Sequence, residues 1–239
     1  MKSLRFLTFA IAILSISACT HAQYRKTVLG NGNVVTKDRK AEDFAGIKVS
    51  SGIDVYLKQG NNMSITVDAD ENLHEYILTE VRNGVLNVYT DANIRESKMK
   101  KVYVTMKDIN SISTTSAGDV VGETPVTSNR LELSASSAGN IKLEVTSKEI
   151  KLNISSSGDM TLSGETDILE ADLSSAGDLN AYELTVREAD ISASSAGDAD
   201  INVTEKLTAR ASSAGDINYR GNPKYIDSHS SSAGGIHKR

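Results

Sequence analysis

The chain has 239 residues, a formal net charge of −5 and one cysteine, Cys19. This length suffices for one large domain or two small ones, and a lone thiol excludes an internal disulfide. Residues 1–110 carry 15 basic and 12 acidic side chains, whereas residues 111–239 carry 11 and 19. The long acidic half argues against a nucleic-acid binder, which needs a basic patch.

The first residues predict an export signal. Lys2 and Arg5 precede an apolar run, residues 7–16, which is shorter than the ~20 residues that span a bilayer as a helix and fits a cleavable signal. The run leads into the sequence ISAC, which is similar to the lipobox of bacterial lipoproteins. In that class the cysteine receives a diacylglyceryl group and becomes the first residue after cleavage. We therefore predict a lipoprotein signal peptide over residues 1–18 and lipidation of Cys19.

Two segments separate this signal from the acidic half. Residues 19–40 are polar and are predicted to be the anchor and a tether, or an entry strand. Residues 41–110 predict an N-terminal β region, with a short helix expected between Asn72 and Glu80. Apolar residues alternate with polar ones on both sides of an early Ser-Ser-Gly turn, at Ile47, Val49, Ile53, Val55 and Leu57.

A short repeat dominates residues 111–239. The sequence SSAGD, or a close variant, occurs seven times, and its glycines are 18 to 21 residues apart. A period near 19 residues indicates a solenoid, in which units stack because none can bury its apolar face alone. The glycines are Gly118, Gly139, Gly158, Gly177, Gly197, Gly215 and Gly234.

Period-two alternation flanks each turn and predicts half-buried strands. Around Gly139 the alternating residues are Leu131, Leu133, Ala135, Ile141, Leu143 and Val145. The predicted fold class is all-β, a right-handed parallel β-helix with coils of about 19 residues. The alternative is an antiparallel β meander or sandwich with each SSAGD at a hairpin tip. Hairpin turns favour Asp-Gly over the Gly-Asp order found here, which favours the solenoid.

Each position of the turn has an expected role. The Ser and Ala residues are small enough for turns to stack at the ~4.8 Å spacing of strands. Gly supplies a left-handed or closely approached backbone. Asp or Asn can hydrogen-bond its own backbone in the turn.

The segments VSSGIDVYLKQG and NGVLNVYT, followed by the run of SSAGD turns that ends in SAGGIHKR, resemble the head GIN domain family of putative autotransporter adhesins. The resemblance covers about residues 40–239. It implies a β-helix in the envelope of a Bacteroidetes-type bacterium and an adhesin function. It brings no catalytic residue.

The predicted lipid anchor places the protein at a membrane, the outer one in a two-membrane bacterium, because a diacylated cysteine is held firmly. The residues after Cys19 read THAQ and lack the acidic run that marks surface export in some Bacteroidetes. The periplasmic face is therefore favoured over the cell surface. A plain secretory signal cut after Ala22, which gives a secreted protein, is the alternative.

The candidate site is a column of turn acids, Asp119, Asp159, Asp178, Asp198 and Asp216. Some β-helices bind calcium through acidic turns, and calcium takes six to eight oxygens. The column lacks the paired glycines and doubled acids of that calcium motif, and it is interrupted in two coils. Turn formation is therefore the favoured role of these acids, and a cation ladder is the alternative. We predict no metal and no cofactor.

The sequence predicts no catalytic residue. No histidine recurs beside the serines, and His21, His74, His229 and His237 lack metal-ligand spacing. The favoured function is a non-enzymatic envelope lipoprotein that presents a solenoid surface as an adhesin or binding module. Its partners would be the membrane, through Cys19, and a protein or glycan ligand. The alternatives are a periplasmic scaffold lipoprotein without a specific ligand and a carbohydrate-active β-helix enzyme.

Overall fold

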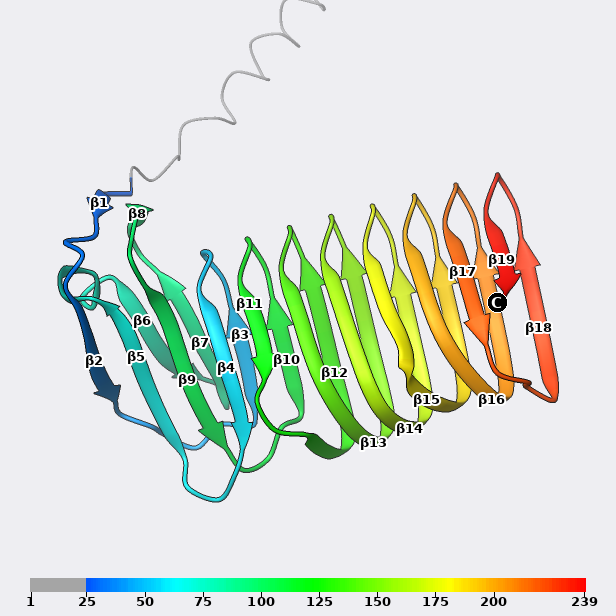
Figure 1. Cartoon of the computed structure of the whole chain (residues 1–239), viewed down its shortest axis with the longest axis horizontal. Coiled ribbons are helices and arrows are strands. Elements are labelled where there is room, and N and C mark those ends of the chain that lie inside the picture. Colours follow the sequence, from blue (N-terminus) through cyan, green and yellow to red (C-terminus); the bar gives the residue numbers. More distant parts are fainter. Residues whose placement is uncertain (1–24) are drawn as a thin grey trace, which may run out of the picture.

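A computed structural model describes residues 25–239, so the predicted signal peptide and Cys19 lie outside the described residues. Most of this part is β-strand, and the strands stack along one long axis (Figure 1). Before the repeat come β1 (Thr27–Leu29), β2 (Val34–Arg39), β3 (Gly46–Val49), β4 (Asp54–Gln59), β5 (Ser64–Asp70), β6 (Ile77–Arg82), β7 (Val85–Thr90), β8 (Asn93–Glu96) and β9 (Lys100–Met106). The repeat contains β10 (Ser111–Thr114), β11 (Asp119–Gly122), β12 (Val126–Ser136), β13 (Asn140–Ser155), β14 (Asp159–Leu173), β15 (Asp178–Ala193), β16 (Asp198–Ala211), β17 (Asp216–Arg220), β18 (Tyr225–Ser230) and β19 (Gly235–Lys238). Among residues 25–239, no helix has the length and apolar character needed to span a bilayer.

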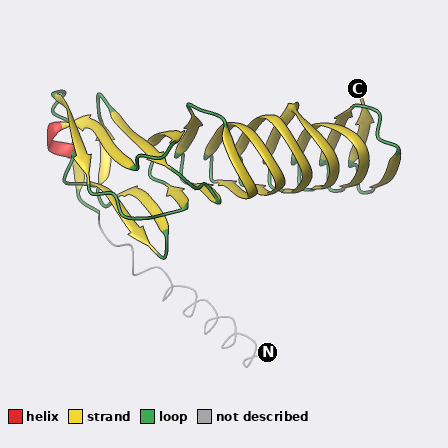
Figure 2. Cartoon of the chain, turned by 90° about the horizontal axis from the view of Figure 1, so that it is seen from below, coloured by secondary structure: helices red, strands yellow, loops and turns green. Residues whose placement is uncertain are grey.

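Each coil of the repeat has two strand segments that face each other across the core (Figures 1 and 2). The chain leaves a tight SSAG turn along the front sheet of Figure 1, rounds a bend, and returns along the back sheet to the next turn. Neighbouring coils pair in register, as Asp159 does with Asp178, nineteen residues further on. Every strand pair within the repeat is parallel. The predicted parallel β-solenoid is confirmed, and the antiparallel meander is wrong.

The core lies between the two sheets and is built from columns of inward residues, one from each coil. Burying an aliphatic side chain contributes about 1.5–3 kcal/mol, so each added coil extends both the hydrogen-bond ladder and the core. The column that ends the back sheet is fully buried and contains Val49, Thr114, Ala135, Ile154, Leu173, Ala193 and Ala211.

The SSAG turns have an unusual backbone. In the turn that starts at Ser174, the central residues Ser175 and Ala176 have φ of 52° and 57°, and Gly177 N–H donates to the Ser174 carbonyl at 3.1 Å. These are the features of a type I′ turn. The amide of Ala176 also donates to the carbonyl of Ser195 in the next turn at 3.1 Å. The ladder between coils therefore continues through the turns, and it offsets the cost of two left-handed residues.

The glycine of each turn is required by close approach. A Cβ on Gly177 would lie 2.8 Å from the backbone carbon and oxygen of Ile154 in the preceding coil. Gly158 and Gly215 face the same obstruction from Ala135 and Ala193. Of the two roles expected for the glycine, the structure therefore shows close approach, and Ser and Ala occupy the left-handed positions.

The N-terminal β region joins the solenoid without a break, because β3 pairs with β10 and β4 with β11 in parallel. Antiparallel pairs β2–β5, β5–β9 and β6–β7 close this end. Within the segment expected to be tether or entry strand, residues 27–29 and 34–39 are strands β1 and β2. The helix expected between Asn72 and Glu80 is reduced to a 3-10 turn, Glu71–Leu73, because β6 pairs with β7 from Ile77 onward.

A buried carboxylate ties this N-terminal end together. Asp70 is 1% exposed and accepts backbone N–H groups of Gly32, Lys98 and Met99 at 3.0, 3.1 and 3.2 Å. Burial by itself would raise the pKa of Asp70, but these donors outweigh it and lower the pKa. The ionised side chain therefore connects the start of β2, the end of β5 and the segment before β9.

In the last coil of the repeat, β18 and β19, polar residues occupy some of the columns that hold apolar residues in earlier coils. Register places Ser230 in the column that Ala211 occupies one coil earlier, and Lys238 in the column of Tyr219. The Lys238 ammonium donates to Asn222 Oδ1 at 2.7 Å. A charged side chain on an edge strand is one device that prevents pairing with another sheet.

The turn geometry predicts opposite effects for two neighbouring substitutions. Gly177→Ala should destabilise the fold by about 3 kcal/mol, as an overpacked site does, because its Cβ has no room beside Ile154. Ala176→Gly should raise the free energy of unfolding, or leave it unchanged, because it relieves the strain of an alanine in the left-handed conformation. Urea unfolding of both variants measures this. Equal destabilisation by both would contradict the assigned roles.

Candidate functional site

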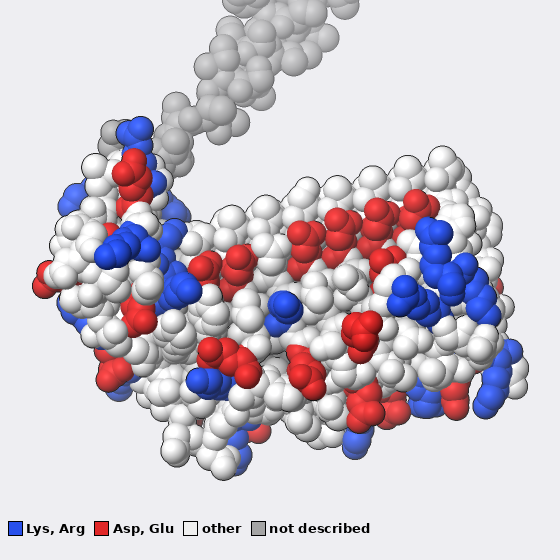
Figure 3. Space-filling view, in the orientation of Figure 1, with Lys and Arg blue, Asp and Glu red and all other residues white. Residues whose placement is uncertain are grey.

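The structure places the predicted turn acids in one column on the outer face of the front sheet. Successive register pairs link Asp119 to Asn140, Asp159, Asp178, Asp198 and Asp216. Asp54 of β4 pairs with Asp119, so the column begins one coil earlier than the sequence indicated. We call this column, from Asp54 to Asp216, the acid ladder. Figure 3 shows acidic side chains in a row along this face.

Burial and neighbouring carboxylates raise the pKa of two residues in the acid ladder. Burial and the carboxylates of Asp159, Asp198 and Asp200 raise the pKa of Asp178. Burial and Asp119 likewise raise the pKa of Asp54. Asn140 relieves the repulsion where it interrupts the ladder, because its Nδ2 donates to Asp119 Oδ1 at 2.7 Å.

Basic groups gather at both ends of the acid ladder (Figure 3). At the N-terminal end, Lys101 pairs in register with Asp54, and its Nζ lies 4.8 Å from the ring centroid of Tyr56. Toward the C-terminal end, the Arg220 guanidinium lies 3.9 Å from the ring centroid of Tyr182. Such contacts are favourable cation–π interactions, and they fix a positive charge at each end of the row.

The ladder is a row of single carboxylates. Within residues 25–239, no three His, Cys, Asp or Glu side chains are grouped to hold a metal ion. His74 lies buried in the N-terminal end, whereas His229 and His237 lie on β18 and β19 of the last coil. His21 and Cys19 lie outside the described residues.

A second surface lies at the bends, opposite the turns, and the bends share one local device. In three successive coils a hydroxyl donates to the carbonyl two residues ahead: Ser128 Oγ to Arg130, Ser147 Oγ to Glu149, and Thr166 Oγ1 to Ile168, at 2.8, 2.9 and 3.2 Å. Such short-range bonds favour turning backbone over continued strand. They therefore place the preceding and following side chains on the outside of the bend.

These outer side chains line an open groove, which we call the bend groove. Its volume is about 1100 Å³, and it crosses the five coils that contain β12 to β16. Figure 2 looks onto this edge of the solenoid. The lining residues are 108–111, 127–130, 132, 146–148, 165–167, 185, 187, 204 and 205. A smaller depression of about 470 Å³ continues from it over the back sheet and shares Ser111, Arg130 and Glu132.

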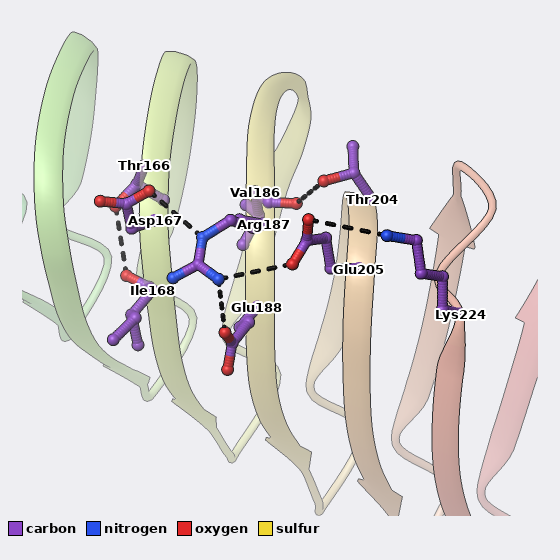
Figure 4. A network of polar contacts seen from close by, with 9 residues as sticks. All are labelled: Thr166, Asp167, Ile168, Val186, Arg187, Glu188, Thr204, Glu205 and Lys224. Carbon is purple, nitrogen blue, oxygen red and sulfur yellow. Dashed lines mark hydrogen bonds and ion pairs between the residues drawn. The ribbon is translucent and has the colours of Figure 1, made fainter.

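Arg187 organises the middle of the bend groove (Figure 4). Its guanidinium contacts Asp167 Oδ1 at 3.3 Å, Glu188 Oε1 at 2.6 Å and Glu205 Oε2 at 3.4 Å, so it links three coils. Lys224 Nζ extends the network to Glu205 Oε1 at 4.0 Å. Exposed ion pairs add little stability one by one, but a shared guanidinium holds several side chains in one arrangement.

The bend groove was not predicted from the sequence, which singled out only the regular turns. A signal was present, because a hydroxyl residue stands at the same place in three bends, at Ser128, Ser147 and Thr166. The residues around it differ from coil to coil, so the bend has no repeated motif comparable to SSAGD.

The parallel coils define the chain as a β-solenoid with two polar outer surfaces. A family model matches most of the chain. The chain belongs to the family described as "Putative auto-transporter adhesin, head GIN domain", whose model matches residues 43–223. The resemblance inferred from the sequence is confirmed, and the family supports a binding role at the cell envelope or surface. No curated protein matches the chain.

Solved structures share the fold. A crystal structure of a "putative adhesin" from Bacteroides fragilis has a TM-score of 0.82 at 24% identity, and covers 89% of this chain and 100% of its own. A "putative adhesin" from Parabacteroides distasonis has a TM-score of 0.75 at 22% identity, covering 90% and 100%. A "Putative lipid binding protein" from the same species has a TM-score of 0.72 at 24% identity, with the same coverage. At these identities the likeness shows the fold alone.

The acid ladder predicts a pH-dependent stability. The raised pKa of Asp178 means that the folded state binds this proton more tightly than the unfolded state, so stability falls as pH rises through that pKa. Asp178→Asn should therefore stabilise the protein at neutral pH and have no stabilising effect in acid. Carboxylates at strand spacing repel by about 1 kcal/mol in water, and salt should reduce the gain.

Thermal unfolding between pH 3 and 8, at low and high salt, measures this effect. The control is Asp227→Asn on β18, which is exposed and stands outside the ladder. A loss of stability in Asp178→Asn at neutral pH would show that the carboxylate is held by favourable contacts.

Proposed function

We propose that the protein is a non-enzymatic binding module of the cell envelope and that it holds its ligand in the bend groove. The observation that carries this proposal is the continuous groove across five coils. Its side chains alternate between hydroxyls, carboxylates and basic groups, and the stacked backbone beneath them is rigid. Concave surfaces with convergent polar groups are where proteins bind ligands. The adhesin family of the chain supports a binding role.

Membrane attachment through Cys19 is part of the proposal. The sequence ISAC after an apolar run supports a lipid anchor, and two acyl chains give a stable attachment. The short THAQ sequence after Cys19 supports the periplasmic face of the outer membrane over the cell surface. A secreted protein is the alternative.

Neither a scaffold without a ligand nor a carbohydrate-active enzyme explains the bend groove as well as a binding module does. A scaffold without a ligand does not require an open polar groove. A carbohydrate-active enzyme needs a carboxylic acid that donates a proton beside a second carboxylate. Asp167 and Glu205 line the groove, and both contact Arg187. Their carboxylates are engaged in ion pairs with one guanidinium, which is not the arrangement of such a pair.

The anchor is tested by Cys19→Ser in the producing bacterium. We expect the wild-type chain in the membrane fraction and the variant in the soluble fraction, because the acyl chains supply the attachment. Protease treatment of intact cells then distinguishes the two faces, and protection until lysis is expected. An unchanged membrane association of the variant would overturn the lipid anchor, and digestion in intact cells would place the chain at the surface.

The groove is tested with the double variant Thr146→Arg/Thr185→Arg. Both threonines are exposed and line the groove, so the substitutions should obstruct it and leave the core unchanged. We expect binding of the purified chain to isolated envelope fractions to fall roughly tenfold. The matched control is Asp178→Asn on the acid ladder, which should bind as wild type. Equal binding by the double variant would place the binding surface elsewhere.

A further inference from the structure

Successive coils contribute polar side chains to the bend groove at a regular interval, and this interval favours ligands with a matching repeat. We propose that it binds an extended, neutral, β-1,4-linked glycan chain that lies parallel to the solenoid axis, with about one sugar residue per coil. This inference rests on the proposed function, because it names the ligand class of the same groove.

The first argument is the match of repeats. Stacked coils are ~4.8 Å apart, and an extended chain of β-1,4-linked pyranose rings advances by nearly the same length per residue, with each ring turned over relative to the ring before it. The groove presents polar residues in register at that interval: Thr127 pairs with Thr146, then Glu165 and then Thr185. From β12 to β16 the groove spans roughly 20 Å. A chain of about five sugars would therefore meet polar side chains of the groove at the interval of the coils.

The second argument is the chemistry of the lining. Hydroxyl, carboxylate and guanidinium groups supply the donors and acceptors that sugar hydroxyls need. Arg187 is held by three carboxylates, so its orientation is set before a ligand arrives, which lowers the entropic cost of binding. Among the described residues that line the groove, none is aromatic. Affinity must therefore come from many repeated hydrogen bonds, and it should grow with chain length.

Charge and backbone pairing disfavour other polymers. The lining carries five carboxylates, Asp108, Glu132, Glu165, Asp167 and Glu205, against three basic side chains, which opposes a polyanionic glycan. A polypeptide strand would need a free sheet edge. The bends between β12 and β16 instead lie in the middle of the ladder, with a paired strand on each side.

The test compares two glucose hexamers that differ only in linkage. Cellohexaose is β-1,4-linked and extended, whereas maltohexaose is α-1,4-linked and curls. With the purified chain lacking residues 1–18, calorimetric titration should show cellohexaose binding roughly tenfold tighter than maltohexaose. Within the cello series, affinity should rise up to about five residues, the length of the groove, and then stay constant. Equal binding of the two hexamers, or no binding of cellohexaose, would overturn the inference.

The groove variants separate this inference from the proposed function. Thr146→Arg/Thr185→Arg should abolish cellohexaose binding, and Asp178→Asn should leave it unchanged. If cellohexaose fails to bind while the double variant still loses envelope binding, the glycan inference is wrong and the groove remains the binding site. If cellohexaose binds equally to the double variant, the sugar lies outside the groove and the inference is wrong.

Discussion

The backbone ladder between coils sets the distance on which the rest of this structure depends. Parallel strands stack at ~4.8 Å, and the turns keep that spacing because their amides also donate to the next turn. The need for glycine in the turn is a consequence of this spacing, because a Cβ on Gly177 would collide with Ile154 of the preceding coil. The ladder also explains how Ser175 and Ala176 can adopt a left-handed backbone, because its hydrogen bonds compensate for their strain.

The same spacing gives the acid ladder and the bend groove different charge distributions. On the front sheet it places identical carboxylates side by side, and burial together with these carboxylates raises the pKa of Asp178. Asn140 and Lys101 moderate the repulsion without breaking the register. At the bends the residues differ from coil to coil, so acids and bases neutralise one another, as Arg187 does with its three partners. One surface repeats a single charge, and the other offers a mixed polar lining.

The sequence was sufficient to predict the solenoid, its period and the column of turn acids, because each depends on a motif that recurs at a fixed interval. It was insufficient for features that depend on contacts between distant segments. Asp54 belongs to the acid ladder through its pairing with Asp119, and no local motif shows this. The helix expected near Asn72 gave way to β6, because pairing with β7 overrode local propensity. The bend groove combines residues from five coils, and only three of these coils share the bend hydroxyl.

A stack of identical strands with unpaired edges is also the geometry by which fibrils grow. On the last coil described here, Lys238 opposes such growth. It occupies the column that Tyr219 occupies one coil earlier. A further copy of the chain docked on this coil would have to bury the ammonium group, and the desolvation of an unpaired charge is expensive. Lys238 therefore disfavours the addition of a second copy of the chain at this coil, and it leaves the coils beneath it undisturbed.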